Sequence, residues 1–211
     1  RGWDTVVTSP TDGPFCEMVR QRGVAVRLFN TARSFNLGAA VEMARLIRSD
    51  AISIVHTHTS FAGMILARLA GRLAGVPVIT HGHGRAPLSR HPLVRACQTA
   101  MNWSTSRVAC SAVIAVSEQT KREWIRQGAP TNKVQVVYNG VDVQRWRTID
   151  SQGARNRLAL SGDRILVVHV GRLDENKGQH VLIRAARLVR NRRQDVRFLL
   201  VGEDLALGGS Y

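Results

Sequence analysis

The residues best suited to chemistry lie in the segment Gly171-Arg172-Leu173-Asp174-Glu175-Asn176-Lys177-Gly178. An apolar run before it predicts a buried strand at residues 165–170, and apolar spacing after it predicts a helix at 181–189. Arg172 and Lys177 therefore lie in a loop that leaves a strand and enters a helix. The first turn of a helix carries unpaired N–H groups and a partial positive charge, which attract anions. The planar guanidinium of an arginine and the ammonium of a lysine beside that turn are suited to binding a diphosphate. Solvated loop cations without a ligand are the alternative.

Two pairs of histidines form the second candidate site. His56-x-His58 and His81-x-His83 each lie at the end of an apolar run that predicts a strand. Gly82 follows His81 and leaves room for a ligand beside its ring, and we expect His83 to point away from His81. Because this spacing also occurs among metal ligands, a metal-dependent hydrolase that uses both pairs stays open as an alternative. It would need a further carboxylate or histidine at another strand end.

Strand and helix patterns alternate along the chain. Strands are predicted at residues 5–8, 24–28, 52–56, 76–80, 112–116, 134–138, 165–170 and 196–201. Helices are predicted near 15–21, 37–48, 61–74, 88–110, 118–127 and 181–189. Ser117 fits the N-cap of one helix, Gly128 its end, and Asn139-Gly140 a turn. This alternation predicts an α/β fold whose parallel sheets are covered by helices on both faces.

The polar stretch 143–163 is expected to be a linker between two domains, residues 1–142 and 164–211. We expect the N-terminal domain to be nearly complete, without its first strand and loop. The C-terminal domain is expected to be only begun, because a sheet of two strands would leave its apolar edges bare.

The amino-acid composition limits the kinds of molecule that this protein is expected to bind. The formal net charge is +15, nearly all of it from arginine, since Lys121, Lys133 and Lys177 are the only lysines. This charge permits attraction to phosphorylated substrates, anionic lipid or nucleic acid. The arginines form no run and aromatic residues are few, so nucleic-acid binding is kept only as an alternative. No apolar stretch reaches the ~20 residues that span a bilayer. Three scattered cysteines predict reduced thiols in the cytoplasm.

Several of these motifs occur in the order that is typical of one enzyme family. They are Val55-His56-Thr57-His58, Val76-Pro77-Val78-Ile79-Thr80-His81-Gly82, Val116-Ser117, Tyr138-Asn139-Gly140-Val141-Asp142, Gly171-Arg172-Leu173 with Lys177-Gly178, and Val201-Gly202-Glu203. In them the chain resembles the family 4-type retaining glycosyltransferases of the GT-B fold. The resemblance covers most of the chain and implies two Rossmann-like, doubly wound domains.

The resemblance also implies a reaction and its residues. A nucleotide-diphosphate sugar would donate its sugar to a saccharide or lipid-linked acceptor, with retention of configuration and without a metal or other cofactor. Gly171, Arg172 and Lys177 would hold the donor diphosphate, and His81 would face the donor sugar as the catalytic residue. The remaining residues expected near the donor are Gly82, Ser117, Asn139 and Gly202.

Two features of the family are missing from these residues. The glycine-rich first loop would precede Arg1, and a pair of glutamates with seven residues between them would follow Tyr211. The 211 residues are therefore expected to be inactive by themselves.

A peripheral contact with anionic membrane on the cytoplasmic face is a further expectation. The face in question comprises Arg90, Leu93, Val94, Arg95, Trp103 and Arg107. The alternative is a helix that packs its apolar side on the sheet and leaves its arginines in solvent.

Overall fold

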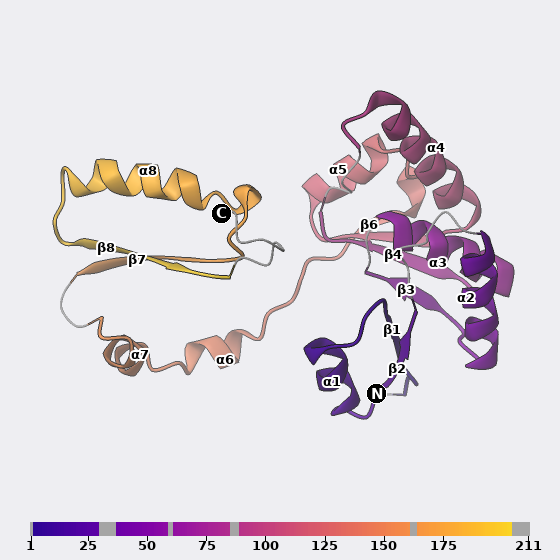
Figure 1. Ribbon diagram of the computed structural model, residues 1–211, viewed down its shortest axis with the longest axis horizontal. Coiled ribbons are helices and arrows are strands. Elements are labelled where there is room, and N and C mark those ends of the chain that lie inside the picture. The colour runs from indigo at the N-terminus through magenta and orange to yellow at the C-terminus, as the bar shows by residue number, and fades with distance from the viewer. Residues whose placement is uncertain (1, 30–36, 59–60, 85–88, 161–163, 204–211) are drawn as a thin grey trace. The chain divides into compact units, whose positions relative to one another are not determined.

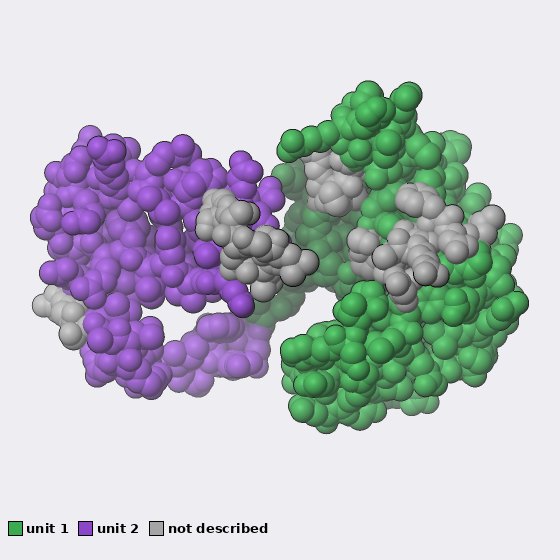
Figure 2. Space-filling view, viewed as in Figure 1, with its two compact units in different colours: residues 1–141 green, residues 142–211 purple. Residues whose placement is uncertain are grey.

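The computed structural model describes residues 2–29, 37–58, 61–84, 89–160 and 164–203. The chain divides into two compact units, Arg1–Val141 and Asp142–Tyr211, which Figure 2 shows in different colours. Each unit has its own parallel sheet structure, so each is described by itself.

The first unit alternates strands and helices (Figure 1). In chain order it contains β1 (Val6–Ser9), α1 (Pro14–Arg20), β2 (Ala25–Leu28), α2 (Leu37–Ser49), β3 (Val55–Thr57), α3 (Phe61–Ala74), β4 (Val78–Gly82), α4 (Pro92–Val108), β5 (Ala112–Ala115), α5 (Glu118–Arg126), the short 3-10 helix η2 (Thr131–Lys133) and β6 (Val134–Val136). Strands β1 and β2 pair in parallel, and β3-β4-β5-β6 form a four-stranded parallel sheet. Because each strand follows its neighbour through a helix, the carboxyl ends of all four strands lie at one edge.

Helix α3 forms the centre of this unit because nine of its 14 residues are buried. One cluster joins α3 to β5 and α5, and a second joins α3 to α2. Gly71 lets the helix come close to the sheet, because a Cβ there would overlap the side chain of Val78. The apolar periodicity of residues 61–74 is thus explained by burial on more than one side.

Helix α3 also buries a charge. The Arg68 side chain is fully buried, and its guanidinium donates to Thr80 Oγ1 at 3.1 Å, Asn102 Oδ1 at 2.9 Å and Thr105 Oγ1 at 3.2 Å. Burial lowers the pKa of Arg68. Helix α4 therefore turns polar residues toward the core and leaves Leu93 and Trp103 exposed. Of the sequence-based alternative, the arginines in solvent are confirmed, since Arg95 and Arg107 are exposed. The purely apolar inner side is wrong, because a buried guanidinium requires hydrogen-bond acceptors and, of the described apolar residues of α4, only Met101 packs beside them on the core.

The second unit is smaller (Figure 1). It contains α6 (Val143–Arg147), α7 (Ser151–Arg157), β7 (Ile165–Val170), the 3-10 helix η3 (Glu175–Lys177), α8 (Gln179–Arg190) and β8 (Val196–Val201). Strands β7 and β8 pair in parallel from Ile165 with Val196 to Val170 with Val201. Helix α8 lies along one face of this strand pair.

The predicted fold class is confirmed, and most predicted elements form with small shifts of their ends. The interval 143–163, expected to be a linker, contains α6 and α7, with Asp142 and Asp150 as their N-caps, and its residues 161–163 lie outside the described residues. No turn forms at Asn139-Gly140, which lies in extended chain after β6. Within the described residues, no helix has the length and apolar character needed to cross a membrane.

Candidate functional site

The loop between β7 and α8 is held in place by three polar side chains. Asp174 accepts hydrogen bonds from the backbone N–H and the side-chain amide of Asn176 at 2.8 and 2.9 Å. Gln179 is buried, and its Nε2 donates to the carbonyl of Arg172 at 2.6 Å. His169 lies 3.1 Å from the carbonyl of Lys177, so its Nε2 carries the proton and donates. These contacts fix the backbone on both sides of the two cations.

Two glycines in this region are required by geometry. Gly178 ends η3 and begins α8 with φ 75°, a left-handed conformation that disfavours side chains. A Cβ at Gly202 would overlap the carbonyl oxygen of Gly171, so the end of β8 touches the start of the loop. Gly171 itself has room for a methyl group, because its nearest side-chain atoms belong to Lys177 at 3.8 Å. The Lys177 stem therefore lies over Gly171.

Both predicted diphosphate-binding cations are exposed at this loop. The Arg172 guanidinium lies 3.6 Å from Asp174 and its side chain is 60% exposed. The hydrogen bonds from Asn176 lower the pKa of Asp174, and the charges of Arg172 and Lys177 add to that effect. Among the described residues, no ion pair holds Lys177. The loop thus carries two cations and two carboxylates, Asp174 and Glu175, beside a helix N-terminus, and of these four only Arg172 and Asp174 form an ion pair within the described part of the chain.

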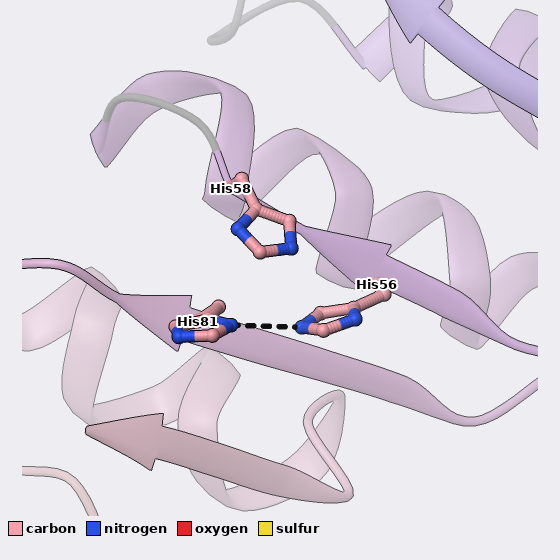
Figure 3. A group of neighbouring side chains, drawn as sticks. All are labelled: His56, His58 and His81. Atoms are coloured by element: carbon pink, nitrogen blue, oxygen red, sulfur yellow. Dashed lines mark hydrogen bonds between the residues drawn. The ribbon is translucent and has the colours of Figure 1, made fainter. Parts of the chain in front are cut away.

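Four of the histidines of the first unit, His56, His58, His81 and His83, come together at the carboxyl ends of β3 and β4. His81 Nδ1 lies 3.3 Å from His56 Nε2, and His58 Nδ1 lies 2.8 Å from His83 Nε2. Figure 3 shows the rings of His56, His58 and His81 gathered around a common space. Burial, and then the charges of neighbouring imidazoles, lower the pKa of these three histidines.

The expectation that His83 points away from His81 is wrong. The two rings stack with centroids 4.4 Å apart and planes 8° from parallel. Residues two apart on a strand share a face, so the extended conformation of β4 carries His83 to the same side.

Of three other predicted residues, Gly82 and Ser117 have structural explanations. The space beside Gly82 is filled by Trp124, since a Cβ there would overlap the indole. Ser117 is the N-cap of α5, as predicted, because its Oγ accepts from the Thr120 N–H at 3.1 Å. Asn139 is exposed after β6. A role for these residues near a donor sugar stays a prediction.

The sequence interpretation missed His169, Asp174 and Gln179 as residues that shape the loop. An Asp just before a short turn is a capping signal that was available. His169 and Gln179 carry no such signal, because their contacts depend on how β7 and α8 pack.

The comparisons with known proteins agree with these two units. Residues 1–145 match the sequence model of Glycosyltransferase Family 4, and residues 150–210 match that of Glycosyl transferases group 1. The chain is 28% identical to an Escherichia coli UDP-Gal:alpha-D-GlcNAc-diphosphoundecaprenol alpha-1,3-galactosyltransferase, over 80% of this chain and 45% of that protein. It is also 28% identical to the D-inositol 3-phosphate glycosyltransferase of Rhodococcus erythropolis, over 94% of this chain and 49% of that protein.

A crystal structure of Anabaena Alr3699/HepE in complex with UDP-glucose has a similar fold. Its TM-score is 0.79 at 23% identity, and the match covers 98% of this chain and 55% of that one. The chain thus spans about half the length of the curated relatives that it matches. Since one family matches more than half of its residues, the chain belongs to glycosyltransferase family 4.

Proposed function

We propose that this protein transfers a sugar from a nucleotide-diphosphate sugar to a saccharide or lipid-linked acceptor, with retention of configuration and without a metal cofactor. The observation that carries the proposal is the loop between β7 and α8, in which Arg172 and Lys177 lie beside a helix N-terminus. Family membership supports the transferase over the hydrolase alternative. A UDP-sugar is the first donor to test, because UDP-glucose is bound in the similar HepE structure.

The fixed loop suits the charge change of the reaction. When the bond to the sugar breaks, negative charge grows on the leaving diphosphate. Arg172 and Lys177 can stabilise that charge without rearranging, because Gln179 and His169 already hold the backbone at both positions. In this proposal the two cations do the work that a divalent metal does in other transferases.

His81 is proposed to contact the donor sugar. It lies at the carboxyl end of β4, where open α/β sheets bind ligands. Its lowered pKa favours a neutral imidazole near pH 7, which can exchange hydrogen bonds with sugar hydroxyls without attracting a second anion.

The test compares cations of equal charge in the complete gene product. Arg172→Ala and Lys177→Ala should each lower kcat/KM by about 30- to 150-fold, which corresponds to about 2–3 kcal/mol of transition-state stabilisation. Arg187→Ala removes the same charge from the exposed far end of α8 and should leave kcat/KM unchanged. If all three variants turn over equally, the diphosphate assignment is wrong.

The donor can be identified by binding. A thermal-shift screen of nucleotide sugars should raise Tm for the true donor, and the shift should disappear in Lys177→Ala. If a nucleotide sugar raises the Tm of Lys177→Ala as much as it raises that of the parent protein, it binds at another site.

We also propose that the protein works in the cytoplasm, at the surface of an anionic membrane, where a lipid-linked acceptor would lie. The E. coli relative is named for such an acceptor, and the three cysteines of this chain are all free. Helix α4 supports the membrane contact, because Leu93, Val94 and Trp103 are exposed beside Arg95 and Arg107.

Vesicle co-sedimentation tests this contact. Leu93→Glu should reduce binding to vesicles that contain anionic lipid, because it places a charge on the apolar face of α4. Leu188→Glu makes the same change at a similarly exposed leucine of α8 and should leave binding intact. If the parent protein fails to sediment with these vesicles at low salt, the membrane contact is wrong.

A further inference from the structure

Four imidazole rings from two neighbouring strands form a cluster, and the proposed sugar transfer uses only one of them, His81. The residues are His56, His58, His81 and His83. The register pairs His56 with Ile79 and Thr57 with Thr80, so the chain brings His58 beside His81 at the end of the strands. Five ring contacts join the four side chains, with centroids 4.4 to 5.3 Å apart.

The hydrogen bonds of these rings are unusual. Within the described part of the chain, the ring nitrogens bond only to one another, through the His56–His81 and His58–His83 pairs. His81 Nε2 is buried and has no partner among the described residues. No carboxylate or backbone carbonyl among those residues bonds to these rings, so the ring nitrogens outside the two His–His pairs can offer lone pairs to a metal ion.

The spacing suits a metal ion. One nitrogen from each of His56, His58 and His81 can be chosen so that all three lie within 4.8 Å of one another. Ligands at ~2.0–2.1 Å from a tetrahedral Zn²⁺ are separated by roughly 3.4 Å, close to the 3.3 Å between His81 Nδ1 and His56 Nε2. The ion would replace the hydrogen bond between these two nitrogens, and the proton they share would move to another ring nitrogen or to solvent. His56 and His58 are exposed, so small ring rotations can bring the third nitrogen in (Figure 3).

We propose that His56, His58 and His81 bind a divalent transition-metal ion, with Zn²⁺ as the probe. Three imidazoles are a ligand set that suits zinc, copper and nickel and disfavours magnesium and calcium. His83 has a supporting role: its Nε2 accepts from His58 Nδ1–H and leaves the lone pair of His58 Nε2 for the ion. A fourth position remains for water or another ligand.

This site is independent of the sugar-transfer proposal, because metal binding needs only the three rings. If both proposals hold, the ion removes His81 from the donor sugar. Added Zn²⁺ then inhibits transfer, and a chelator restores it.

The experiment is a Zn²⁺ titration by calorimetry of the chain, purified without a polyhistidine tag and stripped with a chelator. We expect about one equivalent per chain. His56→Gln, His58→Gln and His81→Gln should each weaken binding by at least about 100-fold, and His83→Gln by about 10- to 100-fold. His91→Gln changes an exposed histidine outside the cluster and should bind like the parent. Circular dichroism checks that each variant is folded.

X-ray absorption of the zinc-loaded parent chain provides a test that needs no variant. The proposal predicts imidazole nitrogens at ~2.0 Å, whereas a sulfur shell at ~2.3 Å would place the ion on a cysteine such as the exposed Cys97. Absence of stoichiometric zinc, a sulfur shell, or equal binding by His56→Gln, His58→Gln, His81→Gln and His91→Gln would each overturn the proposal.

Discussion

Replacing Gly202 by alanine should open the second unit locally. A Cβ at Gly202 would overlap the carbonyl oxygen of Gly171 and lie 3.0 Å from its carbonyl carbon. These are backbone atoms, so no side-chain rotation relieves the contact. Either the segment at Gly171 or the segment at Gly202 must therefore move by about 1 Å.

The expected free-energy cost follows from what that movement breaks. The Gly171 N–H donates to the Val201 carbonyl at 2.9 Å, and the Leu173 N–H donates to the Glu203 carbonyl at 3.0 Å. Each such bond contributes about 1 kcal/mol, and overpacking costs about 1–3 kcal/mol. We therefore expect Gly202→Ala to destabilise the strand pair β7–β8 by about 3 kcal/mol.

Amide hydrogen exchange measures this effect without assuming that the two units unfold together. Peptides from β7 and β8 should exchange about 100-fold faster in Gly202→Ala, while peptides from the first unit should not change. Gly171→Ala is the matched control, because its added methyl group meets the nearest atoms at 3.8 Å. Equal exchange in the two variants would refute the overlap as the reason for glycine at position 202.

Three further predictions concern buried or capping charges. Lys133→Met should lower the free energy of unfolding by about 1.5–3 kcal/mol, because its ammonium donates to three carbonyls around the end of α4; denaturant titration measures the loss. Arg68→Met should change the free energy of unfolding by no more than about 2 kcal/mol, because it removes a desolvated charge but leaves Asn102 Oδ1 without its donor. A larger loss in the same titration would contradict this balance between the cost of burying the charge and the hydrogen bonds it makes. The pKa of Asp174 should be lower in the folded chain than its usual 3.8, so its stabilising effect should be present above pH 3.8 and be lost as pH falls through the folded pKa. Carbon-13 shifts of the carboxyl group measure this pKa, and titration at 3.8 would contradict the capping role.

The sequence predicted the order of strands and helices because apolar periodicity reflects burial directly. It was least accurate where a polar contact decides the outcome. Helix α4 turns Asn102 and Thr105 inward because Arg68 is buried nearby, and no local pattern at 92–108 indicates that distant charge.

In the candidate sites, too, the sequence predicted some residues, while others depend on tertiary contacts. Arg172 and Lys177 could be found from the sequence, because a loop of known type carries them. The side chains that fix this loop could not, since Gln179 and His169 act through tertiary contacts. The histidine cluster needed the strand register, because two H-x-H pairs 25 residues apart form one group only when β3 and β4 pair as observed.

The buried Arg68 has a consequence for how α4 meets its surroundings. Apolar packing tolerates sliding and rotation, but hydrogen bonds to a planar guanidinium hold only over a narrow range of directions. The hydrogen bonds from Arg68 to Asn102 and Thr105 therefore favour one rotation of α4 about its own axis, in which Leu93, Val94 and Trp103 are exposed. Substitutions on that outer side can alter what the helix touches while the fold beneath it stays the same.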